Sequence, residues 1–98
     1  MKRVFSLAAE AKADLLDALA SYDKADGAVA TRFAAAVAAG LVELERRPDA
    51  YPVTYGRLRR LPVEGFPYGI FYRVTSTRVH VAGILHGRRD LSVLRRRK

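Results

Sequence analysis

The chain has 98 residues, of which half are hydrophobic and 29% are charged, with no cysteine and a net charge of +8. This composition is typical of one folded domain over residues 1–98, and it excludes disulfides and thiolate metal sites. No apolar run approaches the roughly 20 residues that span a bilayer, and Glu10, Lys12 and Asp14 interrupt the stretch after the basic start, so we expect a cytoplasmic protein.

The first part of the sequence predicts a short strand and a helix. Residues Lys2–Leu7 combine β-branched and aromatic side chains, as strands do. From Ala8 to Tyr22, apolar residues recur at spacings of three and four, and Leu16 and Leu19 widen the apolar face. These spacings predict an amphipathic helix.

A second helix is expected from Ala28 to Arg46, with Asp26 as its candidate N-cap. Gly40 within it costs about 1 kcal/mol relative to alanine unless packing requires a glycine. The expected buried stripe consists of Val29, Phe33, Val37, Leu41 and Leu44. Because only a short loop separates the helices, they should form an antiparallel hairpin.

Three β-like runs follow, at Tyr55–Val63, Phe66–Val74 and Arg78–His86. Short connections between them predict a three-stranded antiparallel meander. Helices grouped on one face of a mostly antiparallel sheet define an α+β fold.

Strict alternation assigns side chains of these runs to the two faces of the sheet. Tyr68, Ile70, Tyr72 and Val74 should share one face of the middle run. In the last run, one face should carry Val79, Val81 and Leu85, and the other His80, Ala82, Ile84 and His86.

Positive charge is concentrated in the second half of the chain. Residues 1–56 carry 7 Lys and Arg against 8 Asp and Glu, whereas residues 57–98 carry 11 against 2. Ten of these eleven cations are arginine, whose planar fork suits phosphate and carboxylate groups. We therefore expect an anionic partner, which could be RNA, DNA or an acidic protein.

Nine arginines are the candidate target-binding residues. Those of the first β-like run either protect an edge strand or form an anion-binding row with Arg73. The terminal group is the weakest, because a frayed cationic end is common. The candidates are Arg57, Arg59, Arg60, Arg73, Arg88, Arg89, Arg95, Arg96 and Arg97.

The polar and aromatic residues around these arginines have structural alternatives. His80 is expected to be a satisfied core or edge histidine, and His86 either acts as a catalytic base or supports the turn at Gly87. Tyr68 and Tyr72 are more often core residues than platforms for bases. Asp90 either pairs with a neighbouring arginine or caps a short final helix from Leu91.

No cofactor motif is present, and two histidines six residues apart without a neighbouring carboxylate or cysteine do not form a metal site. We therefore expect neither a cofactor nor a metal.

The segments "RLRRLPVEGFPYGIFYRV" and "VHVAGILHGRRD", after a strand and a helical hairpin, resemble the RelE/ParE superfamily of toxins from type II toxin–antitoxin systems. The resemblance spans almost the whole chain. It implies a compact toxin that is neutralised by a cognate antitoxin, whose disordered segment wraps around it.

Within this superfamily, ParE-like toxins poison DNA gyrase, whereas RelE-like toxins cut mRNA in the ribosomal A site. The patterns "FPY.I.Y" and "H.RRD" resemble the ParE side. RelE-like members usually carry a tyrosine or histidine near the C-terminus, and "LSVLRRRK" has neither. The resemblance thus implies a gyrase inhibitor that binds its target without turning over a substrate.

Two alternatives stay open. A ribosome-dependent endoribonuclease would use His86 as base with Arg57, Arg59 and Arg73 as phosphate-binding cations. A non-catalytic nucleic-acid-binding module or an inactive toxin is the second alternative.

Overall fold

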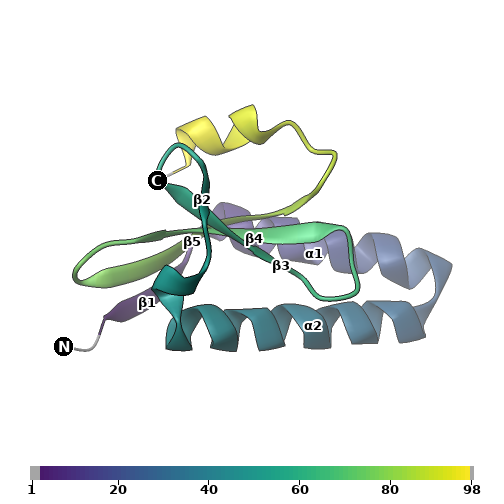
Figure 1. The fold of residues 1–98 in the computed structure, drawn as a ribbon. Helices are drawn as coiled ribbons and strands as arrows, with labels where there is room; N and C mark the ends of the chain where they lie inside the picture. The colour runs from purple at the N-terminus through teal and green to yellow at the C-terminus, as the bar shows by residue number, and fades with distance from the viewer. Residues whose placement is uncertain (1–2, 98) are drawn as a thin grey trace.

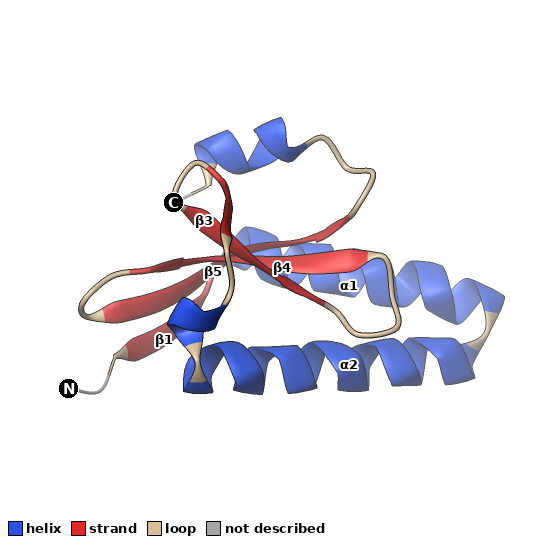
Figure 2. Ribbon diagram, viewed as in Figure 1, coloured by secondary structure: helices blue, strands red, loops and turns tan. Residues whose placement is uncertain are grey.

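The computed structural model describes residues 3–97. Five strands, two long helices and two short 3₁₀ helices follow one another along this part of the chain (Figure 2). In chain order they are β1 (Val4–Leu7), α1 (Ala9–Ala25), α2 (Gly27–Arg46), η1 (Pro48–Ala50), β2 (Val53–Tyr55), β3 (Leu58–Pro62), β4 (Tyr68–Val74), β5 (Arg78–His86) and η2 (Leu91–Arg96).

The strands form one sheet in the order β1-β5-β4-β3-β2. Strand β1 pairs parallel to β5, and every other neighbouring pair is antiparallel. Helices α1 and α2 cover one face, whereas the C-terminal segment, yellow in Figure 1, lies over the opposite face. We call these the helix face and the open face. The predicted α+β class is confirmed.

The helical hairpin forms as expected. The Asp26 side chain accepts a hydrogen bond from the Ala28 amide at 2.9 Å, so the predicted N-cap is confirmed. Phe33, Val37 and Leu44 of the predicted stripe are buried, and Val29 and Leu41 are half-buried. Leu16 is 60% exposed, so its assignment to the buried face of α1 was wrong.

Gly40 brings α2 close to the sheet. A Cβ atom at this position would lie 2.8 Å from Ile70 Cδ1 and 3.1 Å from Leu61 Cδ2, closer than a side chain normally approaches. The helix therefore accepts the cost of a glycine because packing requires it.

Four aromatic rings hold the hairpin against the sheet. Phe33 of α2 lies 4.9 Å from Tyr68 and 5.1 Å from both Tyr22 and Phe66, measured between ring centroids. The pairs with Phe66 and Tyr68 are edge-to-face and the pair with Tyr22 is tilted, and such aromatic packing contributes beyond the area buried. The expectation that Tyr68 and Tyr72 belong to the core is confirmed, because Tyr72 is fully buried and Tyr68 packs on the same cluster.

The three predicted runs form the antiparallel meander β3-β4-β5, and β2 adds a short fourth strand that was not predicted. Gly56 adopts a positive φ of 55°, and with Arg57 it makes a tight turn between β2 and β3. The first run therefore begins as a strand at Leu58 and not at Tyr55, so its predicted start was wrong. Glycine's freedom to adopt left-handed backbone angles is the reason.

A bulge in β5 changes which side chains face the core. Phe71 pairs with Gly83 and Tyr72 with Val81, so Ala82 is an extra residue on β5. Beyond it, Ile84 joins Val79 and Val81 on the helix face, and Leu85 turns to the open face. Strict alternation predicted the reverse for Ile84 and Leu85, and that prediction was wrong.

Helix α2 is also long and apolar enough to cross a membrane by length and composition. The expectation that no segment approaches that length was wrong for this alanine-rich helix. Its apolar stripe, including Phe33, Val37 and Leu44, packs in the core cluster against the sheet, as in the core helix of a folded domain.

Candidate target-binding surface

The arginines of the β2–β3 region do not form the expected row. Arg57 is exposed in the turn, and alternation along β3 and β4 places Arg59 on the helix face but Arg60 and Arg73 on the open face. Arg57, Arg59 and Arg73 therefore do not converge on one phosphate. The turn removes Arg57 from the strand, and the register of β3 with β4 separates Arg59 from Arg73.

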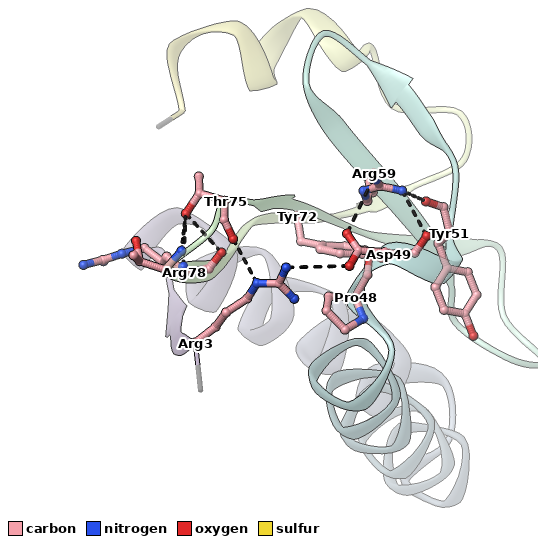
Figure 3. Close-up of polar contacts among 9 residues, drawn as sticks. Arg3, Pro48, Asp49, Tyr51, Arg59, Tyr72, Thr75 and Arg78 are labelled. Carbon is pink, nitrogen blue, oxygen red and sulfur yellow. Dashed lines mark hydrogen bonds and ion pairs between the residues drawn. The ribbon is translucent and has the colours of Figure 1, made fainter. Parts of the chain in front are cut away.

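Arg59 has a structural role at the end of α2. Its guanidinium donates a 2.6 Å hydrogen bond to the Tyr51 carbonyl and lies 3.9 Å from the Asp49 carboxylate. Figure 3 shows Asp49 between Arg59 and Arg3, whose guanidinium is 3.7 Å away. These contacts attach η1 to the sheet.

Tyr72 completes this attachment from inside. Its hydroxyl donates to the Pro48 carbonyl at 2.8 Å (Figure 3). Burial is the main reason that the pKa of Tyr72 is raised to about 12, since the charged phenolate would lose its hydration there.

Arg60 covers an aromatic ring on the open face. Its guanidinium carbon lies 6.0 Å from the centroid of Phe71, at the limit of a cation–π contact. Its side chain also passes over Gly69, where a Cβ atom would collide with it. Arg60 is thus held half-buried on the sheet surface by packing.

His86 supports the turn that follows β5. Its Nδ1 accepts a 3.0 Å hydrogen bond from the Arg88 amide, and its ring packs edge-to-face on Tyr68. The Gly87 amide donates to the Pro67 carbonyl at 2.7 Å in the same turn. The structural role expected for His86 is therefore present, with one ring nitrogen already engaged.

The C-terminal arginines have two different environments. Arg88, Arg89, Arg95 and Arg96 are exposed around the turn and on η2. Asp90 caps η2, because its side chain accepts a hydrogen bond from the Ser92 amide at 2.9 Å. This is one of the two roles expected for Asp90. The hydrogen bond lowers the pKa of the Asp90 carboxyl group. Leu94 of η2 is buried in a second core cluster on the open face.

Arg97 is bound inside the protein instead of extending as a tail. Its guanidinium forms a two-pronged ion pair with Asp14 of α1, at 2.6 and 3.2 Å, and both side chains are about one-tenth exposed. Gly83 makes room for the pair, because a Cβ atom there would lie 2.7 Å from the guanidinium. Arg97 is therefore held by an ion pair, whereas Arg95 and Arg96 are exposed.

The same pair closes an edge of the sheet. Strand β1 accompanies β5 only as far as Val81. Beyond that point the Ile84 amide donates to Asp14 at 3.0 Å, and Arg97 donates to the Ala82 carbonyl at 3.3 Å. The two side chains thus replace the hydrogen bonds that a longer β1 would have made.

Sequence reasoning did not select Asp14, although a signal existed. Asp14 lies three residues after Ala11 and four before Ala18, so it falls on the buried face of α1. An acidic residue on a buried helix face requires a partner. The identity of that partner, Arg97, is visible only in the folded structure.

A solved structure of another protein shares this fold. The structure matches one chain of a solved structure described as "Chromosomal ParDE TA system from P. aeruginosa", with a TM-score of 0.77 and 18% identity, over 87% of this chain and 96% of that one. This match shows that the fold is shared. No curated protein matches the sequence.

The family model for the "ParE toxin of type II toxin-antitoxin system, parDE" matches residues 5–91. The chain therefore belongs to the ParE toxin family of type II toxin–antitoxin systems.

The Asp14–Arg97 pair should contribute strongly to stability. Asp14→Ala and Arg97→Ala should each lower the free energy of unfolding by about 3 kcal/mol, since either leaves one charge buried without its partner. The double variant should cost little more than one single variant. Urea denaturation measures all three.

Asp17→Ala is the matched control, because Asp17 is exposed one turn further along α1. It should change stability by less than about 0.5 kcal/mol. Additive losses from the two single substitutions would contradict a coupled pair.

Proposed function

We propose that this ParE-family chain is the toxin of a type II pair and that it inhibits DNA gyrase in the cytoplasm. The observation that carries the proposal is the family match together with the basic open face. Arg60 lies half-buried on this face, and five exposed arginines lie in the β2–β3 turn, in the turn after β5 and on η2: Arg57, Arg88, Arg89, Arg95 and Arg96. Such a surface favours a target that holds DNA, because the positive field attracts polyanions.

The site geometry gives less support to the ribonuclease alternative. That mechanism needs a proton acceptor beside cations that converge on one phosphate. Arg59 faces Asp49 and Tyr51 on the helix face, away from Arg73. His86 Nδ1 is occupied by the Arg88 amide.

Two assays with purified protein test the target. The chain should inhibit supercoiling by gyrase and should leave mRNA intact in a translation reaction. His86→Ala should inhibit gyrase as well as the unaltered protein does, since His86 is assigned to the turn. Ribosome-dependent mRNA cleavage without any effect on gyrase would contradict the proposal.

The antitoxin is proposed to occupy a groove between α2 and β3. The groove has a volume of about 560 Å³, and small, apolar and aromatic residues line it together with two glutamates: Ala36, Ala39, Gly40, Glu43, Tyr51, Leu61, Pro62 and Glu64. Small side chains let an extended or helical segment approach closely. The net charge of +8 favours an acidic amphipathic segment, whose apolar side chains would fill the groove.

Filling the groove should separate neutralisation from toxicity. Ala39→Arg introduces a long side chain into the groove and should weaken antitoxin binding at least about tenfold, while gyrase inhibition persists. Ala38→Arg is the matched control, because Ala38 is exposed on α2 and does not line the groove. Calorimetry with the protein encoded beside this chain provides the measurement, and equal affinities for both variants would refute this site.

A further inference from the structure

Three strands bring a serine, a histidine and an arginine into one row on the open face. Ser6 of β1 pairs with His80 of β5, and His80 pairs with Arg73 of β4. All three lie on the face opposite the core cluster, since their chain neighbours Phe5, Leu7, Val79, Val81, Tyr72 and Val74 belong to that cluster. The row lies outside the second cluster, which η2 covers, and each of its members is half-buried.

The hydrogen bond within the row orients the imidazole. Ser6 Oγ and His80 Nδ1 are 2.7 Å apart, so Nε2 is the ring nitrogen left for a ligand. When Ser6 donates to Nδ1, the neutral ring carries its proton on Nε2. In this tautomer His80 offers an Nε2–H donor to an anion.

The charges beside His80 are positive. Arg73 lies directly opposite on β4, Ser6 is the neighbour on β1, and the same-face neighbours on β5 are Arg78 and Ala82. Within residues 3–97, neither Arg73 nor Arg78 forms an ion pair with a carboxylate. An arginine fork, an imidazole donor and a hydroxyl in a row about 10 Å long match the oxygens of phosphate groups.

From this arrangement we propose that Ser6, His80 and Arg73 bind the phosphate backbone of duplex DNA. The inference rests on the proposed function in one respect, because gyrase holds DNA while the toxin acts on it. It adds a direct contact between toxin and DNA, made by residues that no family match assigns.

Fluorescence anisotropy with a labelled duplex of about 20 base pairs tests this contact without gyrase. Arg73→Gln should weaken binding about five- to tenfold and reduce the slope of log affinity against log salt by about one, as loss of one phosphate contact does. Arg73→Lys, which keeps the charge, should recover part of the affinity and shows that the strand is intact.

Substitution of the histidine provides a second readout. His80→Gln should weaken duplex binding, because the ring donor at Nε2 is lost. Arg32→Gln, exposed on α2, and His86→Gln are the controls, and both should retain the affinity of the unaltered chain.

Two results would overturn the inference: Arg73→Gln binding DNA as tightly as Arg32→Gln, or His80→Gln binding DNA as tightly as His86→Gln. The gyrase assay is independent of this outcome. If the chain inhibits gyrase but substitutions of Arg73 and His80 do not change DNA binding, only the inference is refuted. If these substitutions weaken DNA binding but the chain has no effect on gyrase, only the proposed function is refuted.

Discussion

The ion pair between Asp14 and Arg97 is the constraint on which the two-sided arrangement of this protein depends. Strand β1 ends before β5 does, and the backbone beyond Val81 would otherwise present unpaired groups at the sheet edge. Asp14 and Arg97 satisfy these groups while neutralising each other. Because Arg97 directly follows η2, the pair fixes η2 over the open face, where Leu94 is buried. One contact therefore joins α1, β5 and the C-terminal segment.

The ion pair and the position of η2 determine which surfaces are left for binding partners. The helix face is filled by α1 and α2, and a groove lined largely by small and apolar residues lies there beside β3. The apolar cluster of the open face is covered by η2, which carries the exposed Arg95 and Arg96. A toxin that must bind both an antitoxin and a target requires two such surfaces of different character. The apolar groove suits the proposed antitoxin, and the basic face suits the proposed DNA-bound target.

Local patterns in the sequence predicted much of the fold. The features that were not predicted depend on contacts between residues far apart in the sequence. Both long helices were predictable, because the spacing of apolar residues is a local pattern. Both caps were predictable as well, because Asp26 and Asp90 each accept a hydrogen bond from an amide two residues further along the chain. The extra residue at Ala82 breaks the alternation on which face assignment relies, and only the pairing with β4 reveals it. Arg97 was interpreted as part of a cationic tail because its partner, Asp14, lies 83 residues away in the sequence. The contact between Ser6 and His80 was not predicted for the same reason, since these residues are 74 positions apart. The family resemblance, carried by two segments, was confirmed over residues 5–91.

Hydrogen–deuterium exchange of the chain, alone and in complex with gyrase, tests the central claim most directly. The claim is that the open face contacts the target while the helical hairpin stays free for the antitoxin. Binding should slow exchange in the β2–β3 turn, in residues 87–90 and in η2, and should leave α1 and α2 unchanged. Protection confined to α1 and α2, with the open face exchanging as in the free protein, would contradict it.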